Sequence, residues 1–203
     1  MNRIPIVIFL ITILGLCSIS HVIIYYASKT YARGDYYVLE TKYVEVDFPR
    51  NWVATTWEDA NSSGNRYGVV FSPMDLRVSM FLIVYDENAT RMYLERNNIH
   101  DAVSSIAFEV KRIYNWTMQK NEDANLIFVK NGTLDVSGHE AEFTMFTIEG
   151  GYVDEKQQHY NWTWIYISWM DSKVWQMAFQ GEEGDWNQAF DTFSYVLNSA
   201  RTR

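Results

Sequence analysis

The stretch Tyr160–Gln180, YNWTWIYISWMDSKVWQMAFQ, decides the fold. Aromatic and β-branched side chains alternate along Tyr160–Met170 with the two-residue period of a β-strand. Asp171–Lys173 predicts a tight turn, and Val174–Gln180 predicts a returning strand. Strands joined by so short a turn must pair antiparallel, because a parallel pair needs a long crossover connection.

The rest of the chain beyond residue 42 repeats this pattern of short strands and turns. Leu76–Asp86 is the most apolar of them and is expected near the centre of the sheet. Asn131-Gly132 is a hairpin signal, and it predicts a turn between two strands. A second turn is expected at Ser137-Gly138-His139. The other predicted strands are Tyr43–Phe48, Trp52–Trp57, Tyr67–Ser72, Leu126–Val129, Thr133–Val136 and Glu140–Ile148.

Two segments carry apolar residues at helical spacing. Ala102–Tyr114 follows Asp101, a good N-cap residue, and Trp186–Ala200 follows Gly184-Asp185. The polar segment Glu87–Asn98 has a possible N-cap at Thr90. The predicted fold class is therefore α+β, with a central antiparallel sheet flanked by helices in an α/β/α sandwich.

The amino-terminal run Ile4–Tyr26 holds 23 uncharged residues, enough to cross a bilayer as a helix. An uncleaved signal anchor is the favoured interpretation. A cleaved signal peptide is the second, although Tyr25 is too bulky for cleavage after Ala27. A lipoprotein acylated at Cys17 is the third, but the preceding Leu16 is not small.

The predicted organisation has three parts. A transmembrane helix occupies residues 1–28, a polar juxtamembrane tether residues 29–42, and one extracytoplasmic domain residues 43–200. Beyond Cys17 the chain has no cysteine, so burial rather than disulfides must stabilise this domain.

The charges that flank the apolar run are nearly balanced, so they do not orient it. Five N-x-S/T sequons lie beyond the run, where roughly two are expected by chance. They favour a glycosylated domain on the outer side of the cell membrane, anchored by a single pass. An idle sequon is the ordinary alternative at any one position, and the candidates are Asn61, Asn88, Asn115, Asn131 and Asn161.

The candidates for chemistry are weak. The net charge of −8 argues against nucleic acid as a partner. The cluster His139, Glu140 and Glu142 is the best short metal pattern, but a solvated turn histidine is the favoured interpretation. Carboxylates at Glu182, Glu183 and Asp185 precede a predicted helix, where a capping role suffices. No phosphate loop, catalytic triad or selected acidic pair is recognisable, so no catalytic residue, cofactor or metal is expected.

Three segments together resemble the PsbP-like family, named for an extrinsic protein of photosystem II. They are the opening YVEVDFPRNW of Tyr43–Trp52, the hairpin LDVSGHEA of Leu134–Ala141, and the ending from Tyr160 through Trp186 to Phe193-Ser194. The resemblance spans residues 43–200 and is greatest to membrane-anchored, extracytoplasmic PsbP-like proteins of archaea and bacteria. It implies helices on both faces of an antiparallel sheet and a non-catalytic binding or accessory role. It implies no metal site, because no ligand residue matches.

We therefore expect a membrane-anchored accessory domain, not an enzyme, with a protein partner near the membrane surface. Two alternatives stay open. One is a surface hydrolase that uses a metal or an acidic pair. The other is a glycan-binding module that uses Trp52, Trp57 or Trp162 as a stacking surface.

Overall fold

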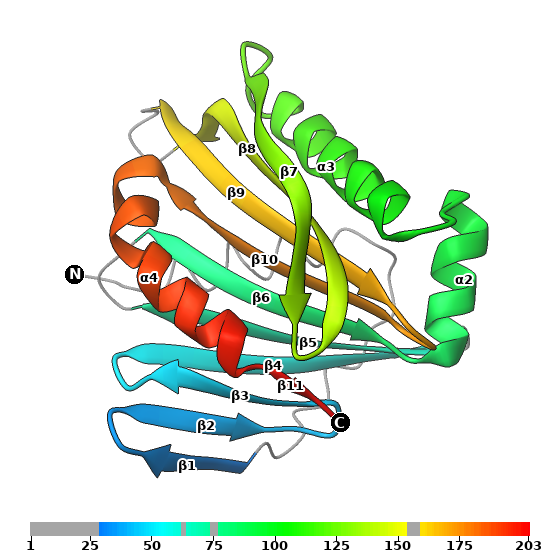
Figure 1. Ribbon diagram of the computed structural model, residues 1–203. Coiled ribbons are helices and arrows are strands. Elements are labelled where there is room, and N and C mark those ends of the chain that lie inside the picture. The colour runs from blue at the N-terminus through cyan, green and yellow to red at the C-terminus, as the bar shows by residue number, and fades with distance from the viewer. Residues whose placement is uncertain (1–28, 62–63, 74–76, 154–158) are drawn as a thin grey trace.

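The computed structural model describes residues 29–203 except 62–63, 74–76 and 154–158. Within these residues the chain forms two antiparallel sheets and three helices (Figure 1). The predicted α+β class with an antiparallel sheet flanked by helices is confirmed, and the second sheet is an addition to it. No described helix has the length and apolar character to cross a membrane. The run Ile4–Tyr26, with its predicted transmembrane helix, lies outside the described residues.

The larger sheet has seven strands in the order β4-β5-β6-β10-β9-β8-β7. Every neighbouring pair is antiparallel. β6 lies inside the sheet, as its apolar sequence predicted. The strands are β4 (Trp52–Asn61), β5 (Gly64–Pro73), β6 (Val78–Tyr85), β7 (Asn125–Val136), β8 (His139–Val153), β9 (His159–Met170) and β10 (Val174–Glu182).

The two faces of this sheet bury different side chains, as the alternation along β9 predicted. Ile165, Ile167 and Trp169 lie in the core beneath α4 (Glu183–Ser199). Trp164 and Tyr166 lie in the core beneath α3 (Ala102–Met118). Helices therefore cover both faces of the sheet. α2 (Glu87–Asn97) packs on Ile83 and Tyr85 at one end of the α3 face.

The smaller sheet has the order β1-β2-β3-β11 and joins the ends of the described chain. Its strands are β1 (Lys29–Arg33), β2 (Tyr36–Glu40), β3 (Val44–Pro49) and β11 (Arg201–Thr202). Residues 29–42 are therefore not a polar tether, which corrects the prediction. They form a hairpin in which Val38 and Leu39 are almost completely buried, and Leu39 joins the core beneath α4. The two buried residues are adjacent, so β2 lacks the alternation that would have predicted a strand.

The helix starts agree with the sequence only in part. Asp101 caps α3 as predicted, with its carboxylate accepting from the Ser104 N–H at 2.7 Å. α2 begins three residues earlier than Thr90, because the Asp86 carboxylate accepts from the Ala89 N–H at 2.8 Å. α4 begins at Glu183, so Asp185 lies in its first turn and does not cap it.

The predicted hairpin turn at Asn131-Gly132 is wrong. β7 continues through both residues, which pair with Thr144 and Phe143 of β8. The reversal occurs at Ser137-Gly138, where both residues have positive φ, 56° and 84°. Two successive positive φ values match the twist of a tight antiparallel hairpin, so the turn geometry and not the Asn-Gly pair sets the register.

Candidate interaction surface

β7 is the terminal strand of the larger sheet, and its first half exposes three consecutive apolar residues. Ile127, Phe128 and Val129 are 41%, 65% and 54% exposed. No other run of neighbouring large apolar side chains is exposed among the described residues, since Val53, Val103 and Tyr195 are single. Because β7 has a strand on one side only, its outer backbone edge is free of ladder partners among the described strands. We call Ile127–Val129 the apolar edge.

A β-bulge explains why three successive residues are exposed. The register with β8 shifts between Phe128, which pairs with Phe146, and Lys130, which pairs with Met145. Leu126 before the bulge packs in the α3 core, whereas Leu134 after it packs in the α4 core. The two leucines are eight residues apart and would face the same side of a regular strand. They face opposite sides here because the extra residue in the bulge reverses the alternation.

A buried polar cluster lies where α2 and α3 meet β10 of the larger sheet. Glu109 is buried, and its Oε2 lies 2.7 Å from both Nε and Nη2 of Arg112. Its Oε1 accepts from the Tyr93 hydroxyl at 3.0 Å. The Gln176 amide donates to Tyr93 at 2.9 Å and to Ser105 at 3.2 Å. These contacts satisfy one another, so the cluster serves to fix α2 and α3 on the sheet.

Three phenols feel the charge of Glu109 in this cluster, those of Tyr85, Tyr93 and Tyr166. Burial raises the pKa of Tyr85 to about 12, and the charge on Glu109 acts in the same direction. Burial and Glu109 likewise raise the pKa of Tyr93 and of Tyr166 above the ordinary tyrosine value. A phenol with a raised pKa stays protonated at neutral pH, and the Tyr85 and Tyr93 hydroxyls donate to Gln176 and Glu109.

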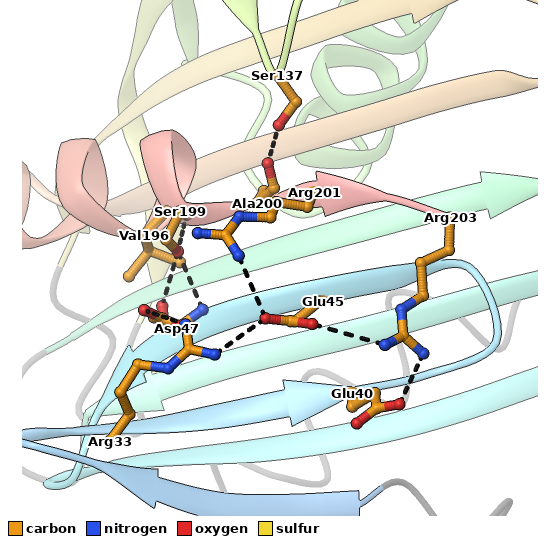
Figure 2. A network of polar contacts seen from close by, with 10 residues as sticks. All are labelled: Arg33, Glu40, Glu45, Asp47, Ser137, Val196, Ser199, Ala200, Arg201 and Arg203. Atoms are coloured by element: carbon orange, nitrogen blue, oxygen red, sulfur yellow. Dashed lines mark hydrogen bonds and ion pairs between the residues drawn. The ribbon is translucent and has the colours of Figure 1, made fainter.

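A network of charged side chains holds the carboxyl-terminal strand β11 on β3 (Figure 2). Glu45 lies at its centre, 3.2 Å from Arg33, 3.6 Å from Arg201 and 3.5 Å from Arg203. Arg203 also contacts Glu40 at 2.7 Å. The three arginines are 42–66% exposed, so each pair contributes little by itself. The network fixes the last residues against the hairpin that begins at Lys29.

Backbone-directed contacts complete this docking. The Ser199 hydroxyl accepts from the Asp47 N–H at 3.0 Å, and its hydrogen lies between the carbonyls of Val196 at 2.8 Å and Asp47 at 3.2 Å. At the tip of the β7–β8 hairpin the Ser137 hydroxyl donates to the Ala200 carbonyl (Figure 2). The carboxyl terminus, the small sheet and the hairpin tip are thus tied together, although they lie far apart in sequence.

The tryptophans proposed for glycan stacking do not form an exposed surface. Trp52 is buried in the α4 core, which removes it as a stacking residue. Trp57 is half-buried and lies beneath the Arg66 guanidinium, 4.9 Å from its ring centroid. Trp162 is half-buried in the α3 core and donates to Gln180 at 3.3 Å. The glycan-binding alternative therefore loses the residues on which it was based.

The predicted metal patterns are not brought together. No group of three or more His, Cys, Asp or Glu side chains converges anywhere in the described part of the chain. His139 instead stacks on Trp169, with ring centroids 6.4 Å apart, and contacts Thr202.

The acidic residues before α4 have structural contacts of their own. Glu182 pairs with Arg77 at 2.9 Å, and Asp185 accepts from the Arg77 N–H at 2.6 Å. Glu183 accepts from the Asn161 amide at 3.5 Å. These carboxylates therefore hold the starts of β6 and β9 against the first turn of α4.

Comparisons with known proteins show likeness in structure only. No family model and no curated protein matches the chain. Cyanobacterial PsbP (CyanoP) from Synechocystis sp. PCC 6803 is 15% identical over 93% of this chain and 99% of that one, with a TM-score of 0.42. LpqN of Mycobacterium tuberculosis, described as involved in cell envelope biogenesis, is 8% identical over 87% and 90%, with a TM-score of 0.40.

A structure from Bacteroides thetaiotaomicron VPI-5482 is 11% identical over 79% of this chain, with a TM-score of 0.39. The alignment spans only 45% of that protein. Likeness at this level assigns the chain to no family, so membership of the PsbP-like family stays a prediction from the sequence.

Proposed function

We propose that this protein is a membrane-anchored, extracytoplasmic, non-catalytic domain that binds a protein partner through the apolar edge of β7. The observation that carries the proposal is the exposure of Ile127, Phe128 and Val129 side by side on a terminal strand. Contiguous exposed apolar side chains are a feature of protein-binding surfaces, and an open strand edge offers backbone hydrogen bonds to an extended partner segment.

The location in the proposal rests on the apolar run and the sequons. The run ends at Tyr26, and the first strand of the fold begins at Lys29. Only Ala27 and Ser28 lie between them, and three Cα–Cα steps span at most about 11 Å, so a retained anchor would hold the folded domain directly at the membrane surface. A partner of this domain is then a membrane protein or a protein bound close to the membrane.

The docking surface is tested by site-specific photo-crosslinking in native membranes. A photoreactive amino acid replaces Phe128 in one full-length variant and Val103 in a matched control. Val103 is also an exposed apolar residue, 57% exposed, but it lies alone on α3. We expect one adduct of reproducible mass from position 128 and none from position 103.

A pull-down with two substituted variants makes this test specific. Phe128→Ser should reduce recovery of the crosslinked partner at least fivefold in a pull-down, while Val103→Ser leaves it unchanged. Equal adducts from both positions, or full recovery with Phe128→Ser, would contradict the proposal. An adduct with twice the mass of the chain would show that a second copy, not a different protein, occupies the edge.

The location is tested separately. An impermeant protease added to intact cells should digest the chain beyond Lys29. Complete protection would place the domain inside the cell and refute that part of the proposal.

A further inference from the structure

Four of the five sequons lie wholly within the described residues, and among these four we infer that Asn131 on β7 is the one that the folded domain presents for glycosylation. A transferase must reach both the asparagine amide and the hydroxyl two residues later. Asn131 and Thr133 are both exposed. Neither side chain forms a hydrogen bond with any described residue. The inference rests on the extracytoplasmic location proposed above.

Backbone geometry separates this sequon from those on helices. Residues i and i+2 of a strand point to the same face, about 6.6 Å apart along the chain. Residues i and i+2 of a helix point to opposite sides. A strand on a sheet edge can therefore show both groups of a sequon to one approaching enzyme, whereas a helix shows only one.

Asn88 and Asn115 illustrate the helical case. Both asparagines are exposed, on α2 and α3. Thr90 turns toward the sheet, where its hydroxyl accepts from the Val174 N–H at 2.9 Å. Thr117 is buried, and its hydroxyl donates to the Ile113 carbonyl at 3.1 Å.

Asn161 lies on a strand, but its sequon is engaged within the fold. Its amide donates to Glu183 at 3.5 Å, and its side-chain carbonyl accepts from the Gly150 N–H at 3.4 Å. Thr163 is buried and its hydroxyl contacts that of Thr147 at 3.1 Å. The fifth candidate, Asn61, ends β4, and its side chain lies outside the described residues.

The modification requires a lipid-phosphate-linked glycan as the donor. The Nδ2 atom of Asn131 forms a bond to C1 of the first sugar, and the bond from C1 to the phosphate oxygen breaks. The lipid phosphate leaves with that electron pair, and the amide nitrogen loses one proton. No oxidant or reductant is needed.

A glycan at this position limits what can dock on β7. Asn131 lies two residues beyond Val129, so about 7 Å separates the sugar attachment from the apolar edge. The glycan blocks pairing of another strand along the second half of β7 and leaves Ile127–Val129 open. It supplies the protection that a terminal strand needs against edge-to-edge aggregation.

The experiment is peptide mapping by mass spectrometry of the full-length protein purified from its native membranes. We expect a glycan mass on the peptide that contains Asn131, and unmodified peptides for Asn88, Asn115 and Asn161. Asn131→Gln and Thr133→Ala should each abolish the increment, whereas the matched control Asn161→Gln should retain it.

An unmodified Asn131 in that protein, or equal modification of Asn115 and Asn161, would overturn the inference. The protease experiment distinguishes the reason. If protease reaches the domain and Asn131 is unmodified, only the glycosylation inference fails; if the domain is protected, the proposed location fails as well.

Discussion

Arg112→Met should destabilise the protein more than Glu109→Gln, although the two variants break the same ion pair. The asymmetry follows from exposure. The Glu109 side chain is 4% exposed, whereas the Arg112 side chain is 49% exposed. Removing the arginine leaves an uncompensated charge inside the protein, but removing the carboxylate charge leaves a guanidinium that water can solvate.

The magnitudes come from the remaining contacts. Removing one partner of an ion pair, so that the other charge stays buried and uncompensated, costs about 3–5 kcal/mol. We expect about 3 kcal/mol for Arg112→Met, because the Tyr93 hydroxyl still donates to Glu109. In Glu109→Gln the amide oxygen keeps the bond from Tyr93, but the amide NH2 takes the place of Oε2 and cannot accept from Arg112. The cost is that lost contact, about 1–2 kcal/mol, because the guanidinium can still be solvated.

The assay is urea unfolding of the detergent-solubilised full-length chain at pH 7, followed by tryptophan fluorescence. The double variant Glu109→Gln/Arg112→Met should be more stable than Arg112→Met alone, because the second substitution removes the stranded charge. Equal losses for the two single variants, or strictly additive losses in the double variant, would refute the reasoning.

Three further predictions concern other parts of the molecule. Burial raises the pKa of Tyr67 and of Tyr85 from 10.0 in the unfolded chain to about 12 in the folded protein. Their contribution to the free energy of unfolding is therefore complete below pH 10 and is lost as the pH rises from 10 to 12. In urea titrations the free energy of unfolding should fall by about 1.4 kcal/mol per pH unit for each, and Tyr85→Phe should reduce that slope. Gly68→Ala should lower the free energy of unfolding by about 1–3 kcal/mol in the same assay, because the added Cβ overlaps the Trp57 ring. Gly184→Ala is the control, since its Cβ meets no neighbour and should not lower the free energy of unfolding. Glu45→Gln should change the free energy of unfolding by less than about 1 kcal/mol, because the arginines it contacts are exposed. It should nevertheless speed amide exchange of Arg201 and Thr202, since it weakens the contacts that hold β11 on β3. Unchanged exchange would show that the backbone hydrogen bonds alone hold β11 in place.

Elements with strong local signals were predictable. The β9–β10 hairpin has regular alternation and a tight turn, and its register agrees with the two faces read from the sequence. α3 has both a capping residue and an apolar stripe, and it begins where Asp101 predicted. In each case the deciding information lies within one turn or one strand.

The errors occurred where a distant segment decides the local structure. Asn131-Gly132 is a good turn sequence, but continuous pairing with β8 keeps it extended. Residues 29–42 have a polar composition, but Val38 and Leu39 gain burial by pairing with β3. The apolar edge was missed for the same reason, since Leu126–Val129 was predicted as an ordinary strand and nothing local indicates that it ends the sheet.

The sequence by itself determined the α+β class, the β9–β10 hairpin, the Asp101 cap of α3, and the sequons as chemical candidates. These depend on period and on neighbours within a few residues. Only the tertiary structure decided that β7 is a terminal strand, that its bulge exposes Ile127–Val129, and that Asn131 and Thr133 are free while the hydroxyls of Thr117 and Thr163 are buried. Exposure depends on which distant segments of the chain cover a residue, and the local periodicity of the sequence does not determine those contacts.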